Sequence, residues 1–560
     1  ETAGDLFSTV SATPAAQLLQ QRLEAGGALS CADVSSAAQP FMAVLLHKIF
    51  PQRPVVVVTD GLKTQESFQQ DIDTWLALES KVQSPQSKGQ EAEDAIQSSK
   101  LKTQTLFFPA WEVLPHESKL PHADVVSERL ETLVELSKVQ SPKSKIVVTN
   151  VVALLQKTFS AEEIKSRMRH LKRGDKIEPL ELIEWLEEQG YEPEAQVSQK
   201  GEIALRGGIL DLFPLISPWP VRLEFFGDEL ESLRYFDPFT QISKEEIPEM
   251  IIPPGGELGI LKKSLESKVL GLESSSEATL DTRHKTQDFS TLLDSLPRET
   301  IFLLCGPELL EEQANRYAEQ LSENDPFFIS WEKFQEEIAG KKMTTLAIQH
   351  SEFQILNPES SIPSTDLNFK SLEIFRPIGN RPPDPEIAEA QRREFFSQLQ
   401  RWLRQNYAIH IFCNNDGERE RFEEIWKEYE LVETNRKASV SVSGGTGVAP
   451  ESCCMINSTA PEIRRDPEFG QARGPFHPLG LWTHLGALAR GFLFEAGKIV
   501  IVTDAEIFGR YKVLRPRRLK APHAPTSRSL LDIDFTELEE GDYVVHLQHG
   551  IGRYRGLQTV

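Results

Sequence analysis

The chain has 560 residues, of which 39% are apolar and 26% are charged, so it can build several hydrophobic cores and lacks the composition of a disordered chain. Its 61 basic and 84 acidic residues give a net charge of −23, which argues against a protein that binds nucleic acid over its whole surface. Five scattered cysteines favour a reduced, cytoplasmic protein, and the lack of a long apolar run argues against association with a membrane.

Residues 1–159 alternate strand and helix signals. Residues 54–60 are a β-branched run typical of a strand buried on both faces, and residues 106–108 and 146–149 are further strand candidates. This alternation predicts an α/β unit with a parallel sheet. Residues 79–104, rich in Ser, Gln, Lys and Glu, are predicted to form a loop inserted at its surface.

Residues 160–245 have the pattern of a small α+β module. A helix is predicted at 179–189, and a β-hairpin is predicted further on, with strands at 221–226 and 229–236 joined by a Gly-Asp turn. The module therefore interrupts the α/β pattern.

Residues 246–365 return to that pattern, and residues 366–508 are predicted to form a further α/β domain. The basic, proline-containing stretch at 509–535 is predicted to be a linker, and residues 536–560 are expected to start a small β-barrel. The fold class expected for the whole chain is α/β and multidomain.

Motifs of the common catalytic sites are absent from the sequence. It has no phosphate loop of the Gly-x-x-x-x-Gly-Lys-Ser/Thr type, no Gly-x-Ser-x-Gly, no His-Glu-x-x-His and no Cys-x-x-Cys. The glycine cluster at 444–447 lacks the phosphate-binding lysine, and His546 with His549 supplies only two ligands of a metal site. We therefore predict neither catalytic residues nor a metal site.

The strand at 221–226 carries an aromatic residue among charges. Period-2 alternation gives the strand an apolar face and puts Arg222, Glu224 and Phe226 on the opposite face. Such a face suits a protein-binding hot spot, because Phe can anchor a partner and Arg can pair with a carboxylate through two hydrogen bonds. The alternative, which spacing alone favours, is that Phe226 packs on a cross-strand neighbour or a covering helix.

The terminal segment at 541–554 combines β-forming residues with Gly550 and Gly552, which lie where a strand must turn sharply. It is either the start of a β-barrel or only a structural turn. Because the sequence begins with Glu1 and stops inside this motif, we expect it to be a fragment of a longer protein.

Four segments resemble those of the bacterial transcription-repair coupling factors. They are residues 108–133, 206–237, 491–510 and 541–557, and they occur in the order found in that family. The last is similar to the opening of the family's RNA-polymerase-interacting domain.

This resemblance implies a more specific architecture. Residues 1–159 and 246–365 would be two parts of a degenerate α/β domain similar to the excision-repair helicase UvrB, interrupted at 160–245 by a module that binds UvrA. Residues 366–508 would form a second α/β domain, and residues 536–560 would begin a CarD-like β-barrel.

The resemblance also implies site residues. On the UvrA-binding surface they are Arg206, Arg222, Phe226 and, as a weaker candidate, Arg234. In the motif of the polymerase-binding domain they are His546, Gly550, Gly552 and Tyr554. We expect Arg222→Ala or Phe226→Ala to weaken UvrA binding without lowering the melting temperature.

A degenerate, inactive nucleotide site is expected as well. Residues 31–40 have no lysine where a phosphate loop would lie, and residues 303–308 have no acidic pair where one would follow a strand. The positions that mark this site are Ser35, Ser36, Cys305 and Glu308. No cofactor is expected in this fragment, whereas the full-length family uses ATP and Mg²⁺.

The expected function is transcription-coupled nucleotide excision repair. The fragment would be the recruitment and scaffold half, binding UvrA and the β subunit of stalled RNA polymerase in the bacterial cytoplasm. Contact with damaged double-stranded DNA would be made by an absent ATP-driven motor. Two alternatives stay open: an active UvrB-type helicase with an unrecognised nucleotide site, and a regulator that only binds polymerase.

Overall fold

The structure of the chain is a computed structural model. It describes residues 3–82, 105–138, 145–274, 289–349, 364–375, 385–442, 463–465, 480–508, 543–546 and 550–553.

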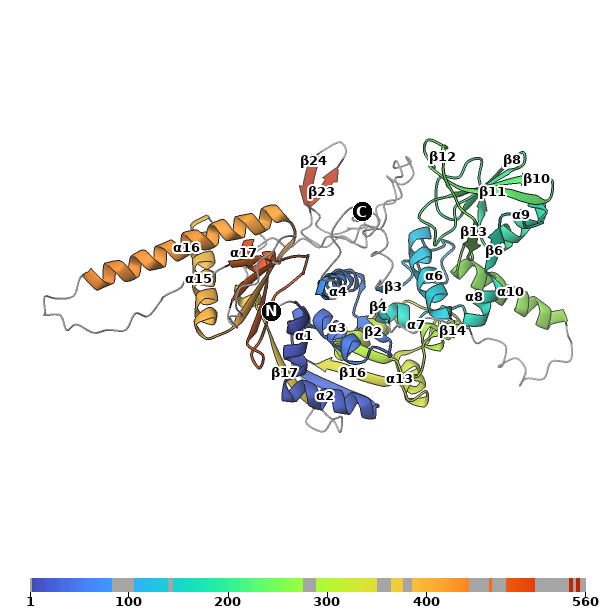
Figure 1. Cartoon of the computed structure of the whole chain (residues 1–560). Coiled ribbons are helices and arrows are strands. Elements are labelled where there is room, and N and C mark those ends of the chain that lie inside the picture. Colours follow the sequence, from blue (N-terminus) through green and yellow to red (C-terminus); the bar gives the residue numbers. More distant parts are fainter. Residues whose placement is uncertain are drawn as a thin grey trace.

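One large, mostly parallel sheet organises the described part of the chain (Figure 1). Its strand order is β19–β20–β18–β22–β21–β17–β1–β16–β15–β2–β4–β3, and only β21 pairs antiparallel with its neighbours. The strands are β1 (Ala28–Val34), β2 (Val55–Thr59), β3 (Leu106–Phe108), β4 (Ile146–Asn150), β15 (Ile301–Cys305), β16 (Thr344–Gln349), β17 (Ser364–Ser371), β18 (Ala408–Cys413), β19 (Ile463–Arg465), β20 (Leu481–Leu485), β21 (Phe492–Phe494) and β22 (Ile499–Thr503). The predicted mixed α/β class with several domains is confirmed.

Helices cover both faces of this sheet because its central strands are apolar on both sides. In β2, Val55 and Val57 pack into one core, and Val56 and Val58 pack into another. The first core also contains residues of α1 (Ala3–Ser11), α2 (Pro14–Ala25), α3 (Gln39–Ile49) and α4 (Leu62–Val82). The second contains residues of α6 (Ala123–Ser137), α7 (Val151–Leu155), α8 (Ala161–Ser166), α10 (Leu258–Ser274), α12 (Pro307–Ala318) and α13 (Trp331–Gly340).

The small module projects from one end of the molecule, at the right of Figure 1. Its sheet has the order β12–β11–β10–β9–β8–β7, and the helix α9 (Pro179–Glu188) shares its core. The strands are β7 (Glu192–Pro193), β8 (Glu202–Arg206), β9 (Ile209–Leu212), β10 (Val221–Phe226), β11 (Glu229–Phe236) and β12 (Ser243–Glu246). The predicted hairpin is confirmed residue for residue by β10 and β11, and the predicted helix is confirmed to within one residue.

Two short antiparallel pairs lie where the chain enters and leaves the module. β6 (Arg169–Lys172) pairs with β13 (Glu249–Ile252), and β5 (Lys157–Thr158) pairs with β14 (Ser290–Thr291). After the module the chain returns to the large sheet, where β15 pairs with β2. The strands before and after the module therefore belong to one sheet.

The strands of the further α/β unit continue this sheet. β17 pairs in parallel with β1 and antiparallel with β21, so the expected boundary at residue 366 falls inside a strand that joins the two units. The second unit has its own core, formed with α15 (Pro385–Arg404), α16 (Asp416–Val442) and α17 (Asp504–Phe508).

Two expectations about connecting segments have different outcomes. The loop expected at 79–104 begins too early, because α4 continues to Val82 and its apolar stripe is still buried at Leu78. The remainder of that loop lies outside the described residues, as does the linker expected at 509–535. In the described part of the chain, no helix is long and apolar enough to cross a bilayer.

Candidate functional site

Strands β8, β10 and β11 bring three of the four expected UvrA-binding residues, all arginines, to one face of the module's sheet. Arg222 of β10 lies opposite Arg234 of β11 and opposite Asp211 of β9. Two residues further along β10, Glu224 lies opposite Ile209 of β9. On its other side, Ile209 lies opposite Arg206 of β8. These residues alternate with the buried core positions, so all of them point to the outer face of the sheet.

Phe226 stands at the end of this outer face and is 80% exposed. The pairing register shifts between Glu224 and Phe225 because β11 has an extra residue there, and Phe225 packs partly against the core of the module as the alternation of β10 requires. The alternative that Phe226 packs under a helix or on a neighbouring strand is therefore wrong. An exposed aromatic side chain beside charged residues has the character of a binding anchor.

Arg222 is placed differently from Phe226, because its guanidinium is used inside the module. Nε donates to Asp211 Oδ1 at 2.7 Å, Nη2 donates to Asp211 Oδ2 at 2.8 Å, and Nη1 donates to the Gln241 carbonyl at 3.1 Å. The guanidinium also lies 4.6 Å from the ring centre of Phe236. The side chain of Asp211 is only 2% exposed, so this is a buried ion pair.

This geometry corrects the expectation that Arg222→Ala leaves the melting temperature unchanged. Removing one partner of a buried pair leaves the other charge uncompensated, at a cost of roughly 3–5 kcal/mol. Arg222 therefore holds β9, β10 and the 237–242 loop together, and its substitution should destabilise the module.

Arg206 and Arg234 are more accessible. The Arg206 guanidinium donates to the Ala195 carbonyl, with distances of 3.2 Å from Nε and 2.8 Å from Nη2, and the residue is exposed. Arg234 is 40% exposed at its side chain and lies 3.8 Å from Glu224. Because an arginine has five N–H donors, both can bind a further acceptor without breaking these contacts.

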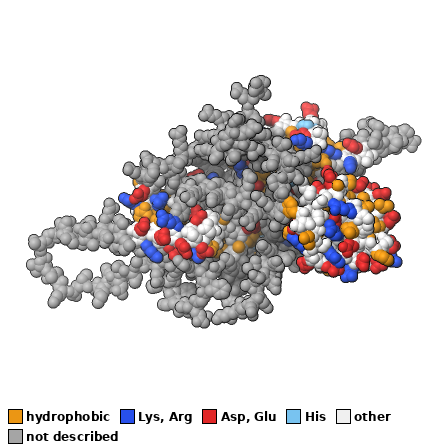
Figure 2. All heavy atoms as spheres, turned by 90° about the horizontal axis from the view of Figure 1, so that it is seen from above, with side chains coloured by type: hydrophobic (Ala, Val, Ile, Leu, Met, Phe, Trp, Pro, Cys, Tyr) orange, Lys and Arg blue, Asp and Glu red, His pale blue; other side chains and the backbone are white. Residues whose placement is uncertain are grey.

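Ile209 joins this surface, although the sequence reasoning did not select it. It is 36% exposed and lies between Arg206 and Glu224 on the outer face. The alternation of β9, in which Leu210 and Leu212 are buried, could have identified it. We call Arg206, Ile209, Glu224 and Phe226 the open face. Figure 2 shows hydrophobic side chains among charged ones on the module, at the right of the view.

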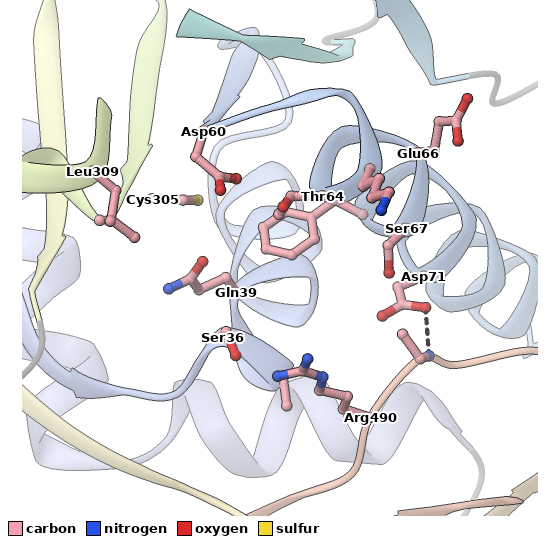
Figure 3. Close-up of a pocket in the computed structure, with 15 residues that line it drawn as sticks. Ser36, Gln39, Asp60, Thr64, Glu66, Ser67, Asp71, Cys305, Leu309 and Arg490 are labelled. Atoms are coloured by element: carbon pink, nitrogen blue, oxygen red, sulfur yellow. Dashed lines mark hydrogen bonds between the residues drawn. The ribbon is translucent and has the colours of Figure 1, made fainter. Parts of the chain in front are cut away.

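The positions expected to mark a degenerate nucleotide site are only partly brought together. Ser36 and Cys305 line a cavity of about 550 Å³ at the carboxyl ends of β1, β2 and β15 (Figure 3). Ser35 is adjacent to Ser36 in the chain and Glu308 follows shortly after Cys305, but neither of the two lines the cavity. The sequence reasoning missed Gln39, Asp60 and Arg490, which do.

Burial changes the protonation of two groups that line this cavity. Burial raises the pKa of the Cys305 thiol, so the group is a neutral thiol rather than a ligand or nucleophile. Burial also raises the pKa of Asp71 to about 8, although its carboxylate accepts a hydrogen bond from the Ala489 amide at 2.8 Å. Among the described residues, no group of three His, Cys, Asp or Glu side chains could hold a metal ion.

At the other end of the chain, the expected polymerase-binding motif forms part of a hairpin. β23 (Tyr543–His546) pairs antiparallel with β24 (Gly550–Arg553), and His546 lies opposite Gly550. Gly552 lies opposite Val544. Tyr554 lies outside the described residues. The backbone thus brings three of the four residues of the motif together.

Comparisons with known proteins agree with this arrangement. The model of the UvrB interaction domain matches residues 170–257, and that of the CarD-like/TRCF RID domain matches residues 538–560. The transcription-repair-coupling factor of Haemophilus influenzae is 25% identical over 493 residues, which are 82% of this chain and 38% of the relative. That of Bacillus subtilis is 26% identical over 509 residues, which are 84% of this chain and 39% of the relative.

The chain spans about two fifths of the length of these relatives. The one from Escherichia coli is 24% identical over 80% of this chain and 37% of its own length. The likeness covers the large sheet as well as the module. The chain is thus related to the transcription-repair-coupling factors, as its motifs predicted.

Proposed function

We propose that this chain acts in transcription-coupled nucleotide excision repair as the recruitment and scaffold part of a coupling factor. The module binds UvrA through the open face, and the terminal hairpin belongs to the contact with RNA polymerase. The observation that carries the proposal is the position of Phe226: a side chain with 80% exposure lies on a module that matches the UvrB interaction domain.

The finer architecture is part of this proposal. Residues 1–159 and 246–365 are two parts of one UvrB-like domain, and residues 160–245 are the module inserted in it. Residues 366–508 are a second α/β domain. Support comes from the return of the chain to the large sheet after the module, where β15 pairs with β2.

The terminal parts complete the proposed architecture. Residues 509–535 are proposed to be a linker and residues 536–560 the start of a CarD-like barrel. The match of residues 538–560 to the CarD-like/TRCF RID domain supports the second assignment.

The partners follow from the same reasoning. The polymerase contact is proposed to be with the β subunit, in the bacterial cytoplasm, whereas damaged DNA and magnesium ATP are bound by an ATP-driven motor outside the matched part of the relatives. An active helicase in this chain is disfavoured, because the residues around the cavity supply neither a phosphate-binding lysine in the turn after β1 nor a metal-binding acidic pair after β15.

The proposal is tested by titrating purified UvrA with the chain and following heat. Phe226→Ala should weaken binding at least about 30-fold, because a hot-spot aromatic contributes about 2 kcal/mol or more. The matched control is Ile374→Ala, since Ile374 is 81% exposed but lies outside the module. Equal affinities of the wild type and Phe226→Ala would refute the proposed role of Phe226. No binding by the wild type would refute the proposed function.

A further inference from the structure

The cavity beside the large sheet is formed by parts of the chain that lie far apart in sequence. Its walls include α4, the carboxyl ends of three strands, and Ala489 and Arg490 of the segment 486–491 (Figure 3). Two hydrogen bonds fix the last segment against α4: Thr74 Oγ1 donates to the Ala487 carbonyl at 2.7 Å, and the Ala489 amide donates to Asp71 at 2.8 Å. A cavity of about 550 Å³ in this position has the size and place of a small-molecule site in α/β proteins.

Two buried polar side chains line this cavity and form no hydrogen bond with each other. Gln39 is 5% exposed and Ser67 is 8% exposed, and both line the cavity. Among the described residues, neither the Gln39 amide nor the Ser67 hydroxyl forms a hydrogen bond with another protein group. Because both groups line the cavity, a ligand bound there can form hydrogen bonds with them without breaking bonds inside the protein.

The charges around the cavity limit what it can bind. Asp60 and Glu66 oppose Lys63 and Arg490, and Asp71 is largely protonated at neutral pH because its pKa is about 8. The side chains are therefore close to neutral in sum. The N-termini of α4 and α12 also meet here, and each contributes about half a positive charge. This surplus offsets part of the charge of one phosphate group, which is about −1.5 to −2, and falls much further short of the charge of three.

We propose that this cavity binds a nucleoside monophosphate. Arg490 and Lys63 take the phosphate near the helix N-termini. Asp60 accepts hydrogen bonds from ribose hydroxyls, as acidic residues do in nucleotide-binding α/β folds. The Gln39 amide can donate and accept at one base edge, a pattern that suits adenine. The cavity and its ligand are independent of the proposed binding of UvrA.

The test is calorimetric titration of the whole chain with AMP, ADP, magnesium ATP, adenosine and inorganic phosphate. AMP should bind. Magnesium ATP should bind at least about tenfold more weakly, because its additional phosphates are repelled or poorly solvated in the cavity, and a tenfold difference in Kd corresponds to about 1.4 kcal/mol. Gln39→Ala and Arg490→Ala should each weaken AMP at least about tenfold. The control is Arg393→Ala, since Arg393 is 61% exposed on α15 and lies outside the cavity lining.

Arg490→Ala decides the test if Gln39→Ala fails to fold, because the Arg490 side chain is 39% exposed and is not part of a core. Magnesium ATP binding as tightly as AMP would overturn the proposal. So would inorganic phosphate binding as tightly as AMP, which would mean a plain anion site. No heat from AMP at millimolar concentration would overturn it too. Unchanged UvrA binding by both variants would separate this result from the proposed repair function.

Discussion

Substitution of Arg222 tests whether this residue stabilises the module or contacts a partner directly. In Arg222→Ala, Asp211 loses two hydrogen bonds of 2.7 and 2.8 Å and keeps a charge that is 2% exposed. The loss of a partner in a buried pair costs roughly 3–5 kcal/mol. The contact with Phe236 adds about 0.5–2 kcal/mol, partly offset because the Arg222 side chain is 16% exposed.

We therefore expect Arg222→Ala to destabilise the module by about 3 kcal/mol. For a domain of this size, the unfolding transition should shift by roughly 10 °C or more, as measured by differential scanning calorimetry. Adding Asp211→Asn should restore part of the loss, because it removes the unpaired charge. Phe226→Ala is the companion control and should change stability by less than about 0.5 kcal/mol, since Phe226 is 80% exposed.

The reasoning would be refuted by an unchanged transition in Arg222→Ala together with loss of UvrA binding. That result would mean that Arg222 is a direct contact and that its bonds to Asp211 are dispensable. A double variant no more stable than Arg222→Ala would also contradict it, because the cost would then not come from the buried charge.

Three further predictions concern the rest of the molecule. Glu257→Gln should lower the free energy of unfolding by roughly 3–5 kcal/mol, because Glu257 and Arg129 are fully buried and joined by contacts of 2.6 and 3.0 Å; an unchanged urea midpoint would contradict this. The pKa of Asp71 is raised by burial from 3.8 to about 8, so its contribution to stability is complete below pH 4 and is lost as the pH rises to about 8. Asp71→Asn keeps an acceptor for the Ala489 amide and should flatten the decline of the melting temperature between these pH values; parallel profiles of variant and wild type would show that Asp71 is not its source. The purified chain should release no phosphate from ATP above background, and release that depends on magnesium and the chain would mean that an active site has been overlooked.

The sequence predicted the elements whose patterns are local. The hairpin of β10 and β11 was found from alternation and its turn, and β2 was found from its β-branched run. Each of these signals lies in one short stretch of the chain, so no long-range contact was needed to recognise them.

The roles of the individual site residues depend on pairings across strands, and these could not be read from one strand. The alternation of the strand puts Arg222 and Phe226 on the same face. Only Arg222 binds a buried carboxylate, however, because Asp211 lies opposite it on β9. In the same way, Arg490 reaches the cavity only because residues 486–491 pack on α4. The sheet that joins the two α/β units also arises from a distant pairing, that of β17 with β1.

The most direct test of the proposed function is hydrogen–deuterium exchange of the whole chain with and without UvrA. The proposal predicts that UvrA slows exchange at residues 206–209 and 224–227, which form the open face around Phe226, while α15 at the other end of the molecule is unaffected. Protection confined to parts outside the module, or no protection at saturating UvrA, would contradict it.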